Sequence, residues 1–317
     1  MNRRYARVIA TIAASGALAF TLSACATTGM PSACSPSVES GGASETITAS
    51  SSLGSAPVVE FPTPLYSNGV QASVLIEGDG TPVQEGEWVT AEITLLDGTN
   101  GEVIETTAYD DAQPFAALFE ALPLAIPDGL ECQPTGSRIA LTIPATVAFG
   151  DAEVPAPLTE DDTLVAVVDI VSSVTARASG TILPSTAGVP SVVRAPNGQP
   201  GITIPGGDAP SDYREATLIQ GDGATVATGD SVLVQYTGVT WAGGEVFDST
   251  WDSGAPTTLV ADEASVIPGF AKALTGKEVG SQVIAVIPPD EAYGDQAQSA
   301  IPANSTLVFV IDILAIQ

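Results

Sequence analysis

The chain contains one sequence pattern twice. LIEGDG at 75–80 recurs 143 residues later as LIQGDG at 218–223, and TLVAVVDIV at 163–171 recurs with the same spacing as TLVFVIDIL at 306–314. Two units of about a hundred residues exclude a solenoid, which is built from several shorter repeats. The sequence therefore predicts two domains that share one fold.

Each copy has the pattern of a β-rich domain. SVLVQYTG at 231–238 alternates apolar and polar residues with the period of a strand, and apolar β-branched runs follow it. The one candidate helix is short, from Pro268 to Thr275. A sheet with a single short helix must bury its apolar face on that helix, which predicts an α+β fold. The copies are assigned to residues 70–175 and 213–317.

Two stretches rich in Pro, Gly and Ser lie outside the copies. Residues 176–212 predict an extended, semi-ordered linker. Residues 25–69 predict an extended arm ahead of the first copy. Within this arm APVVEFPTPL at 56–65 could pair as an edge strand, although we expect it to run extended.

The first 24 residues have the pattern of a signal peptide. Three arginines precede an apolar run that ends at Leu22, too short for a membrane span of about 20 residues. LSAC at 22–25 resembles a bacterial lipobox, in which Cys25 is lipidated and becomes the first residue of the mature protein. The alternative is cleavage after Ala24 with an unmodified thiol. We expect an exported protein, held outside the cell membrane by a lipid anchor alone.

Cysteine content is consistent with export. Cys34 and Cys132 remain beside Cys25, and an even pair in an oxidising compartment predicts a disulfide between the arm and the first copy. Two buried free thiols are the alternative. A zinc site is not favoured, since two cysteines and no histidine cannot supply four ligands.

The charge of the chain excludes one class of partner. There are 37 acidic and 9 basic residues, a net charge of −28. Such a surface repels phosphates, which argues against nucleic-acid binding. The charge fits solubility at a cell surface or a salt-adapted proteome. GDG at 78–80 and 221–223 lacks the ligand spacing of a calcium loop.

The second copy carries a set of ordered motifs between Leu218 and Leu314. They are YTG at 236–238, FDST at 247–250, VIPGF at 266–270, AYG at 292–294 and IPANSTLVFVIDIL at 301–314. In order and nearly in spacing, these motifs resemble the FKBP family of peptidyl-prolyl cis/trans isomerases. Two copies behind a lipobox are similar to actinobacterial FKBP-type lipoproteins. The resemblance implies two FKBP-like domains, each an antiparallel β-sheet curled around one short α-helix with a shallow pocket between them.

The resemblance also implies a site of nine residues in the second copy. Aromatic rings form its wall and floor, apolar residues its rim, and a carboxylate orients one ring. Matched by position, these are the wall residues Tyr236, Phe247 and Phe309, the floor residue Phe270, the rim residues Val266 and Ile267, the edge residue Ile301, the hydroxyl of Tyr293, and Asp248, which bonds the Tyr236 hydroxyl.

Such a site needs neither a base nor a nucleophile. Rotation about an X–Pro bond crosses a barrier of about 18–20 kcal/mol without making or breaking a covalent bond. An apolar pocket that binds the twisted amide better than the planar one lowers that barrier. The absence of histidine is thus no objection, and no cofactor is implied. We expect unfolded or extended proline-containing polypeptides with an apolar X as substrates, and the resemblance adds macrolides such as tacrolimus as ligands.

The two copies depart from the family pattern to different extents. In the second, the floor is Phe270 where tryptophan is usual, an aromatic wall position falls at Thr257, and an arginine position falls at Ser253. In the first, the matching residues keep apolar character but lose most rings and hydroxyls, which predicts a degenerate domain that acts as a spacer, a client-holding domain or a partner surface. These residues are Ile93, Ile104, Glu105, Leu130, Phe149 and Ala166.

Two further functions compete with isomerisation. A polypeptide-binding holdase or interaction module would use the pocket or a sheet edge without useful catalysis, and the departures at the floor and wall favour it slightly. The other function is that of a small-molecule receptor lipoprotein, and only the predicted pocket supports it.

Overall fold

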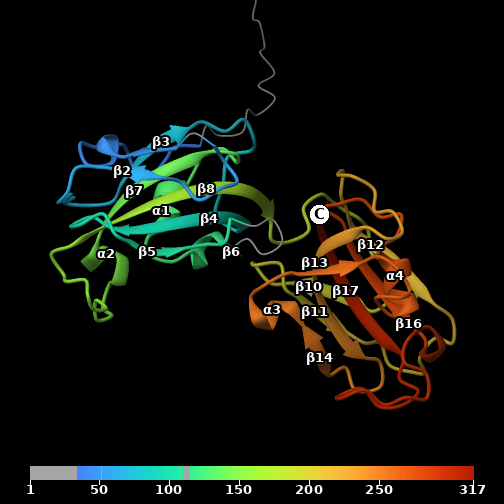
Figure 1. The fold of residues 1–317 in the computed structure, drawn as a ribbon. Coiled ribbons are helices and arrows are strands. Elements are labelled where there is room, and N and C mark those ends of the chain that lie inside the picture. Colours follow the sequence, from blue (N-terminus) through green and yellow to red (C-terminus); the bar gives the residue numbers. More distant parts are fainter. Residues whose placement is uncertain (1–33, 51, 110–114) are drawn as a thin grey trace, which may run out of the picture. The chain divides into compact units, whose positions relative to one another are not determined.

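A computed structural model describes residues 34–50, 52–109 and 115–317. The predicted signal peptide at 1–24 and the predicted lipidation site at Cys25 lie outside the described residues. Two antiparallel sheets account for most of the fold, and the helices are short (Figure 1). One sheet is formed by strands up to Thr175 in the sequence, and the other by strands that follow it. Among the described residues, no helix is long and apolar enough to cross a membrane.

The C-terminal sheet is antiparallel throughout. Its strands lie in the order β14, β13, β17, β16, β12 and β9, and β15 pairs with β13. Strand β17 is central, and its burial on both faces matches its nearly continuous apolar sequence. The bounds are β9 (Thr181–Ile182), β12 (Arg214–Gln220), β13 (Ser231–Thr240), β14 (Val246–Ser249), β15 (Thr257–Val260), β16 (Gln282–Ile287) and β17 (Leu307–Ile316).

One helix, α4 (Pro268–Leu274), packs on the inner face of this sheet, as the sequence predicts. Proline suits its first turn, and Gly276 follows its end with a φ of +78°. Gly269 permits the close approach, because a Cβ there would lie 2.3 Å from a side-chain carbon of Ile287. The remaining elements of this half are α3 (Thr250–Ser253) and the 3-10 helix η3 (Pro289–Glu291).

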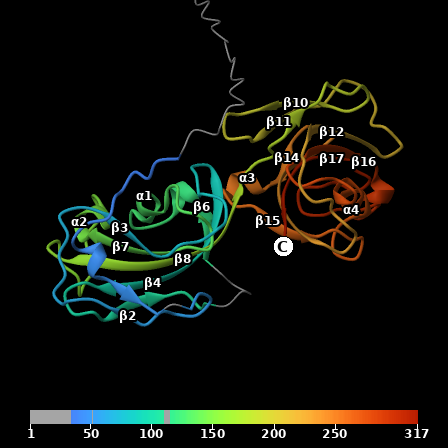
Figure 2. The same ribbon diagram turned by 90° about the horizontal axis from the view of Figure 1, so that it is seen from above.

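The outer face of the C-terminal sheet is covered by the segment that precedes it. Strands β10 (Ser191–Arg194) and β11 (Pro200–Thr203) form a hairpin, which lies across the sheet from α4 (Figure 2). Val192 and Ile202 pack against the buried cluster that contains Ile284. The prediction of an extended, semi-ordered linker at 176–212 is therefore wrong for these strands. The outer face carries an apolar cluster of its own, which includes Ile284, Val286, Val308 and Val310, and this cluster needs a cover.

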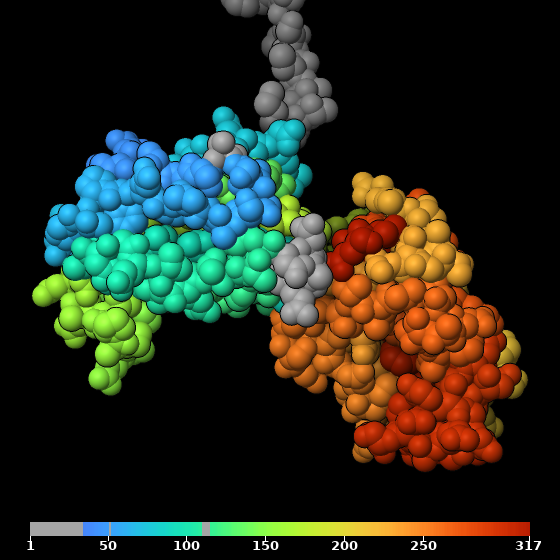
Figure 3. Space-filling model, viewed as in Figure 1, coloured from blue at the N-terminus to red at the C-terminus, as the bar shows by residue number. Residues whose placement is uncertain are grey.

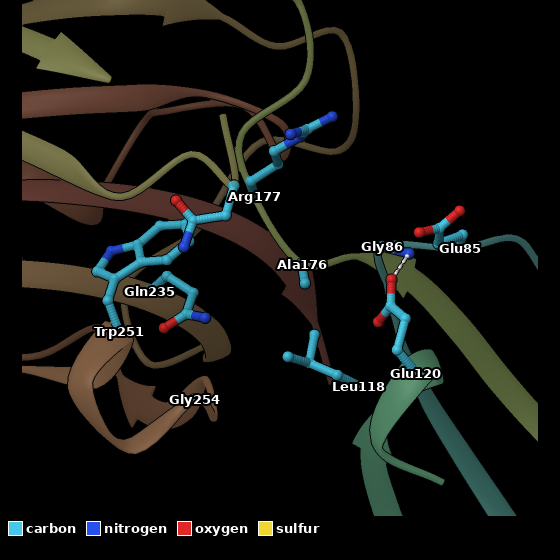
Figure 4. Close-up of a pocket in the computed structure, with 10 residues that line it drawn as sticks. Glu85, Gly86, Leu118, Glu120, Ala176, Arg177, Gln235, Trp251 and Gly254 are labelled. Carbon is cyan, nitrogen blue, oxygen red and sulfur yellow. Dashed lines mark hydrogen bonds between the residues drawn. The ribbon is translucent and has the colours of Figure 1, made fainter. Parts of the chain in front are cut away.

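The N-terminal sheet repeats this design. Its strands lie in the order β3, β7, β8, β4 and β5, and β6 pairs with β4. Short helices lie beside it, and one of them holds Glu120, whose carboxylate accepts a 2.6 Å hydrogen bond from the Gly86 N–H (Figure 4). The bounds are β3 (Gln71–Ile76), β4 (Glu87–Asp97), β5 (Val103–Thr106), β6 (Phe115–Leu118), β7 (Arg138–Pro144), β8 (Thr163–Thr175), α1 (Ile126–Leu130), α2 (Ala145–Phe149) and the 3-10 helix η2 (Phe119–Ala121).

The N-terminal arm covers the outer face of this sheet. It forms η1 (Ser44–Thr46) and a small hairpin of β1 (Thr48–Ala49) with β2 (Val59–Glu60). Ile47 packs with Leu96 and related sheet residues, so the expectation that the arm runs extended is wrong here. Figure 3 shows the arm, in blue, as part of the surface of this half.

A buried ion pair ties the arm to the sheet. Arg138 is fully buried and donates two hydrogen bonds, at 2.5 and 2.6 Å, to the carboxylate of Asp169. Its guanidinium also donates to the Ser50 and Ser55 carbonyls of the arm. A bidentate pair of this kind is strong and directional. Because a buried charge without its partner is costly, Arg138 favours the arm in its covering position.

A second connection reaches the arm from the first copy. Cys34 and Cys132 are each disulfide-bonded. Since the chain has three cysteines, they must be bonded to one another.

Candidate functional site

A cavity of about 480 Å³ opens between α4 and the inner face of the C-terminal sheet. The structure brings all the predicted site residues except Ile301 to this cavity. Ile301 is 7% exposed and belongs to the apolar core. The cavity is lined by Tyr236, Phe247, Asp248, Leu259, Glu263, Ala264, Ser265, Val266, Ile267, Pro268, Phe270, Tyr293 and Phe309.

Four aromatic rings from three strands and the helix form the inside of the cavity. Phe309 on β17 stands at the centre, with its ring centroid 5.4 Å from Phe247, 5.1 Å from Phe270 and 5.9 Å from Tyr236. All of these pairs meet edge to face, the geometry that the ring quadrupoles favour. The rings hold one another in place and present an apolar, preorganised surface.

Gly238 explains how two of these rings come so close to the strand. It pairs with Phe309 on β17 and with Asp248 on β14. A Cβ at Gly238 would lie 2.6 Å from a ring atom of Phe247 and 2.8 Å from one of Phe309. The glycine of the YTG motif therefore makes room for the ring cluster.

One carboxylate fixes the orientation of the tyrosine ring. The Tyr236 hydroxyl donates a 2.5 Å hydrogen bond to Asp248 Oδ2. Burial, followed by this bond and the negative charge of Asp248, raises the pKa of Tyr236 well above its usual value of 10.0. The phenol thus stays protonated and keeps its ring in place as a hydrogen-bond donor.

The rim consists of the loop that leads into α4. Asp262 Oδ1 accepts hydrogen bonds from the N–H groups of Ala264 at 3.0 Å and Ser265 at 2.8 Å, which fixes the loop. Ile267 is the residue that precedes α4, and its N–H donates to no described residue. This group and the 38% exposed Tyr293 are polar groups available to a ligand amide.

Part of this lining was not predicted from the sequence. Leu259 lies on β15, and Glu263, Ala264 and Ser265 lie in the rim loop. Asp262 precedes Glu263 and the small residues Ala264 and Ser265. An aspartate at the start of such a stretch indicates a turn, and this signal could have extended the rim toward its N-terminal side. The predicted aromatic position at Thr257 also lies on β15 but does not line the cavity.

The N-terminal half has the same register with different side chains. Leu95 pairs with Ala166 and Glu105, as Gly238 pairs with Phe309 and Asp248. Leu95 is 7% exposed and lies in the core, where the other half has a glycine beneath two rings. The position matching Phe247 is Ile104, which is 45% exposed.

The other positions that match the site in this half are also apolar. Leu130 is fully buried, and Ile93 and Phe149 are half-buried against the core. The ring cluster thus has no counterpart among these matched residues. Within the described ranges, no group of three or more His, Cys, Asp or Glu side chains is arranged to hold a metal ion.

Comparison with known proteins identifies relatives of the C-terminal half. Residues 223–314 match the family model described as FKBP-type peptidyl-prolyl cis-trans isomerase. The FK506-binding protein of Streptomyces anulatus is 34% identical over 120 residues, which are 37% of this chain and 97% of that protein. The probable FK506-binding protein of Corynebacterium glutamicum is 36% identical over 117 residues, 37% of this chain and 98% of that protein.

A third relative is longer than the matched region. FkpA of Escherichia coli, described as an FKBP-type peptidyl-prolyl cis-trans isomerase, is 37% identical over 97 residues. The match covers 31% of this chain and 35% of that protein.

Proposed function

Because this chain belongs to the family of FKBP-type peptidyl-prolyl cis-trans isomerases and is itself such an enzyme, we propose that the ring-lined cavity of its C-terminal half is the isomerase site. The observation that supports the proposal is the cluster of four edge-to-face rings between α4 and the sheet, with one carboxylate on Tyr236. The matched residues 223–314 contain all of these side chains.

The mechanism follows from the chemistry of the lining. A planar X–Pro amide is polar because of its resonance, and the twisted amide has lost that charge separation. The ring cluster disfavours the planar form relative to the twisted one, so it lowers the barrier by differential binding. The Ile267 N–H and the Tyr293 hydroxyl hold the carbonyl groups of the substrate at the rim. Each of these donors fixes one part of the chain while the other part rotates.

The substrates that we propose are X–Pro bonds in unfolded or extended polypeptides. Phe270 and Phe309 are 4% and 5% exposed, and they suit the compact, apolar proline ring. A macrolide such as tacrolimus would occupy the same cavity, as the names of the two FK506-binding relatives suggest. Phe270 offers it a smaller floor than tryptophan would.

The N-terminal half, in this proposal, is a second FKBP-like domain that has lost the isomerase site. The equal strand register of the two halves and the same cover over the outer face support a common fold. Leu95 and Ala166 in place of Gly238 and Phe309 support the loss of the site. The roles that remain for such a domain are to hold client polypeptides, to act as a spacer between the enzyme and its lipid anchor, or to bind a partner.

The proposed place of action is the outer side of the cell membrane. The signal peptide and the LSAC sequence at 22–25 support export and a lipid anchor at Cys25. Mass spectrometry of the N-terminal peptide from the membrane fraction tests this, and an unmodified Cys25 in the exported protein would contradict it.

The folding role has a direct test. A denatured secreted protein whose slow refolding phase is set by an X–Pro bond refolds over tens of seconds without help. The full chain in catalytic amounts is expected to shorten this phase. A chain that delays refolding, or that acts only at stoichiometric amounts, would instead be a holdase.

A further inference from the structure

The isomerase cavity carries negative charge without a basic counterpart. Its lining includes the carboxylates of Asp248 and Glu263 and neither lysine nor arginine. The two lysines of this half are both engaged elsewhere. Lys272 pairs with Glu291 at 2.7 Å, and Lys277 pairs with Glu215. The field at the cavity mouth is therefore that of its own carboxylates.

The two carboxylates differ in what they contact. Asp248 accepts a hydrogen bond from the Tyr236 hydroxyl. Glu263 is exposed on the rim loop, and its carboxylate bonds no described residue. The loop that carries it is held by the two hydrogen bonds to Asp262 Oδ1. Glu263 is thus a charge at a fixed place on the rim with no partner in the described part of the chain.

Three residues after this charge, the rim becomes apolar at Val266 and Ile267. A lysine or arginine side chain has a matching construction, with an apolar stem and a charged end. Its stem can cover the two rim residues while its charge reaches Glu263. The net charge of −28 adds a long-range attraction for basic chains, which speeds their encounter.

In place of the apolar X expected from the sequence, we propose that Glu263 is a specificity-determining residue, through which the cavity selects X–Pro bonds in which X is lysine or arginine. The inference rests on the proposed site and names its substrate class. Basic, unfolded polypeptides are then the preferred clients.

The experiment compares two peptides that differ in one charge. One has lysine at X, and the other has acetyl-lysine, which keeps the stem and lacks the positive charge. Isomerisation by the full chain is followed by NMR exchange, without an accessory protease. Because exposed ion pairs are weak, kcat/KM is expected to be about two- to fivefold higher for lysine at low salt. The ratio should approach one at about 1 M salt, where the screening length is roughly 3 Å.

Two matched variants assign the preference to its residue. Glu263→Gln is expected to lower the lysine to acetyl-lysine ratio toward one. Glu245→Gln removes the same charge from an exposed turn of the same half, outside the cavity, and should keep the ratio. The ratio within each variant cancels any change in its general activity.

Each outcome bears on a different claim. Equal kcat/KM values for the two peptides would overturn the inference and leave the isomerase site intact. An unchanged ratio in Glu263→Gln would overturn the role of this residue. No acceleration of either peptide would overturn the proposed site together with the inference.

Discussion

A single missing side chain at Gly238 allows the ring cluster to form. The Gly238→Ala change would put a Cβ within 2.8 Å of Phe247 and Phe309, so at least one ring must move. Overpacking of this kind costs about 1–3 kcal/mol in stability. We expect kcat/KM to fall by about tenfold or more, since each 1.4 kcal/mol of lost transition-state binding is a factor of about ten.

Gly206→Ala is the matched control for this change. Nothing lies within 4 Å of the Cβ it would add, so activity and stability should be retained. Full activity and stability in Gly238→Ala would show that the ring positions do not depend on this glycine.

A buried acid in the C-terminal sheet gives a pH-dependent stability. Burial raises the pKa of Asp312 from 3.8 to about 6, although the Ala178 N–H, the Gln282 amide and Arg194 act to lower it. Asp169 is the matching residue in the N-terminal sheet. It accepts hydrogen bonds from the buried Arg138, whereas Asp312 accepts one from the uncharged Gln282. The ordinary pKa applies in the unfolded chain. Stability from this group is therefore complete below pH 4 and is lost as the pH rises through about 6.

The Asp312→Asn variant isolates this effect, because asparagine keeps the shape and does not titrate. The difference in unfolding free energy, wild type minus variant, should fall by a few kcal/mol between pH 4 and pH 7, at about 1.4 kcal/mol per unit of pKa shift. Denaturant unfolding at several pH values measures it. A difference that stays constant would contradict a raised pKa in the folded state.

At the scale of elements, each sheet depends on the segment that precedes it. Val192 and Ile202 of the β10–β11 hairpin pack on a cluster that contains Ile284, Val286 and Val308. A chain of residues 213–317 lacks this cover and should be less stable than residues 176–317 by at least about 3 kcal/mol, because each buried apolar side chain contributes about 1.5–3 kcal/mol. Denaturant unfolding of the two chains measures the difference, and equal stability would show that the hairpin is dispensable.

The segments that cover the outer faces of the sheets could not be predicted from the sequence, whereas the helix could. The helix at Pro268–Leu274 was predictable because its proline, apolar spacing and following glycine agree. Strands β10 and β11 have four residues each, too few for a periodic pattern, in a stretch whose Pro and Gly content favours a linker. They form because the outer face of the sheet offers them an apolar surface, which is a tertiary effect.

The site was predictable to a similar degree. The rings of Tyr236, Phe247 and Phe309 were assigned through ordered motifs that resemble a family, and the structure brings them into one cavity. The exposed loop at 263–265 carries no such motif. Ile301 was assigned to the cavity edge. It is buried in the apolar cluster that also contains Phe270 and Phe309, but it is not among the residues that line the cavity.

At the scale of the whole molecule, two halves with one strand register differ in what fills the centre of the sheet. One has Gly238 beneath the rings of Phe247 and Phe309, and the other has Leu95 beside Ala166. We therefore expect all isomerase activity to come from the C-terminal half. A change confined to its cavity should silence the full chain.

That claim is tested most directly by prolyl isomerisation with the full chain and two cavity variants. Tyr236→Ala removes one ring of the cluster, and Asp248→Val removes the carboxylate that orients it. Circular dichroism confirms that both variants are folded. We predict that the wild type accelerates isomerisation and that each variant loses at least about tenfold in kcat/KM, a loss of about 1.4 kcal/mol in transition-state binding. Wild-type activity in both folded variants would contradict this assignment and place the isomerase site outside this cavity.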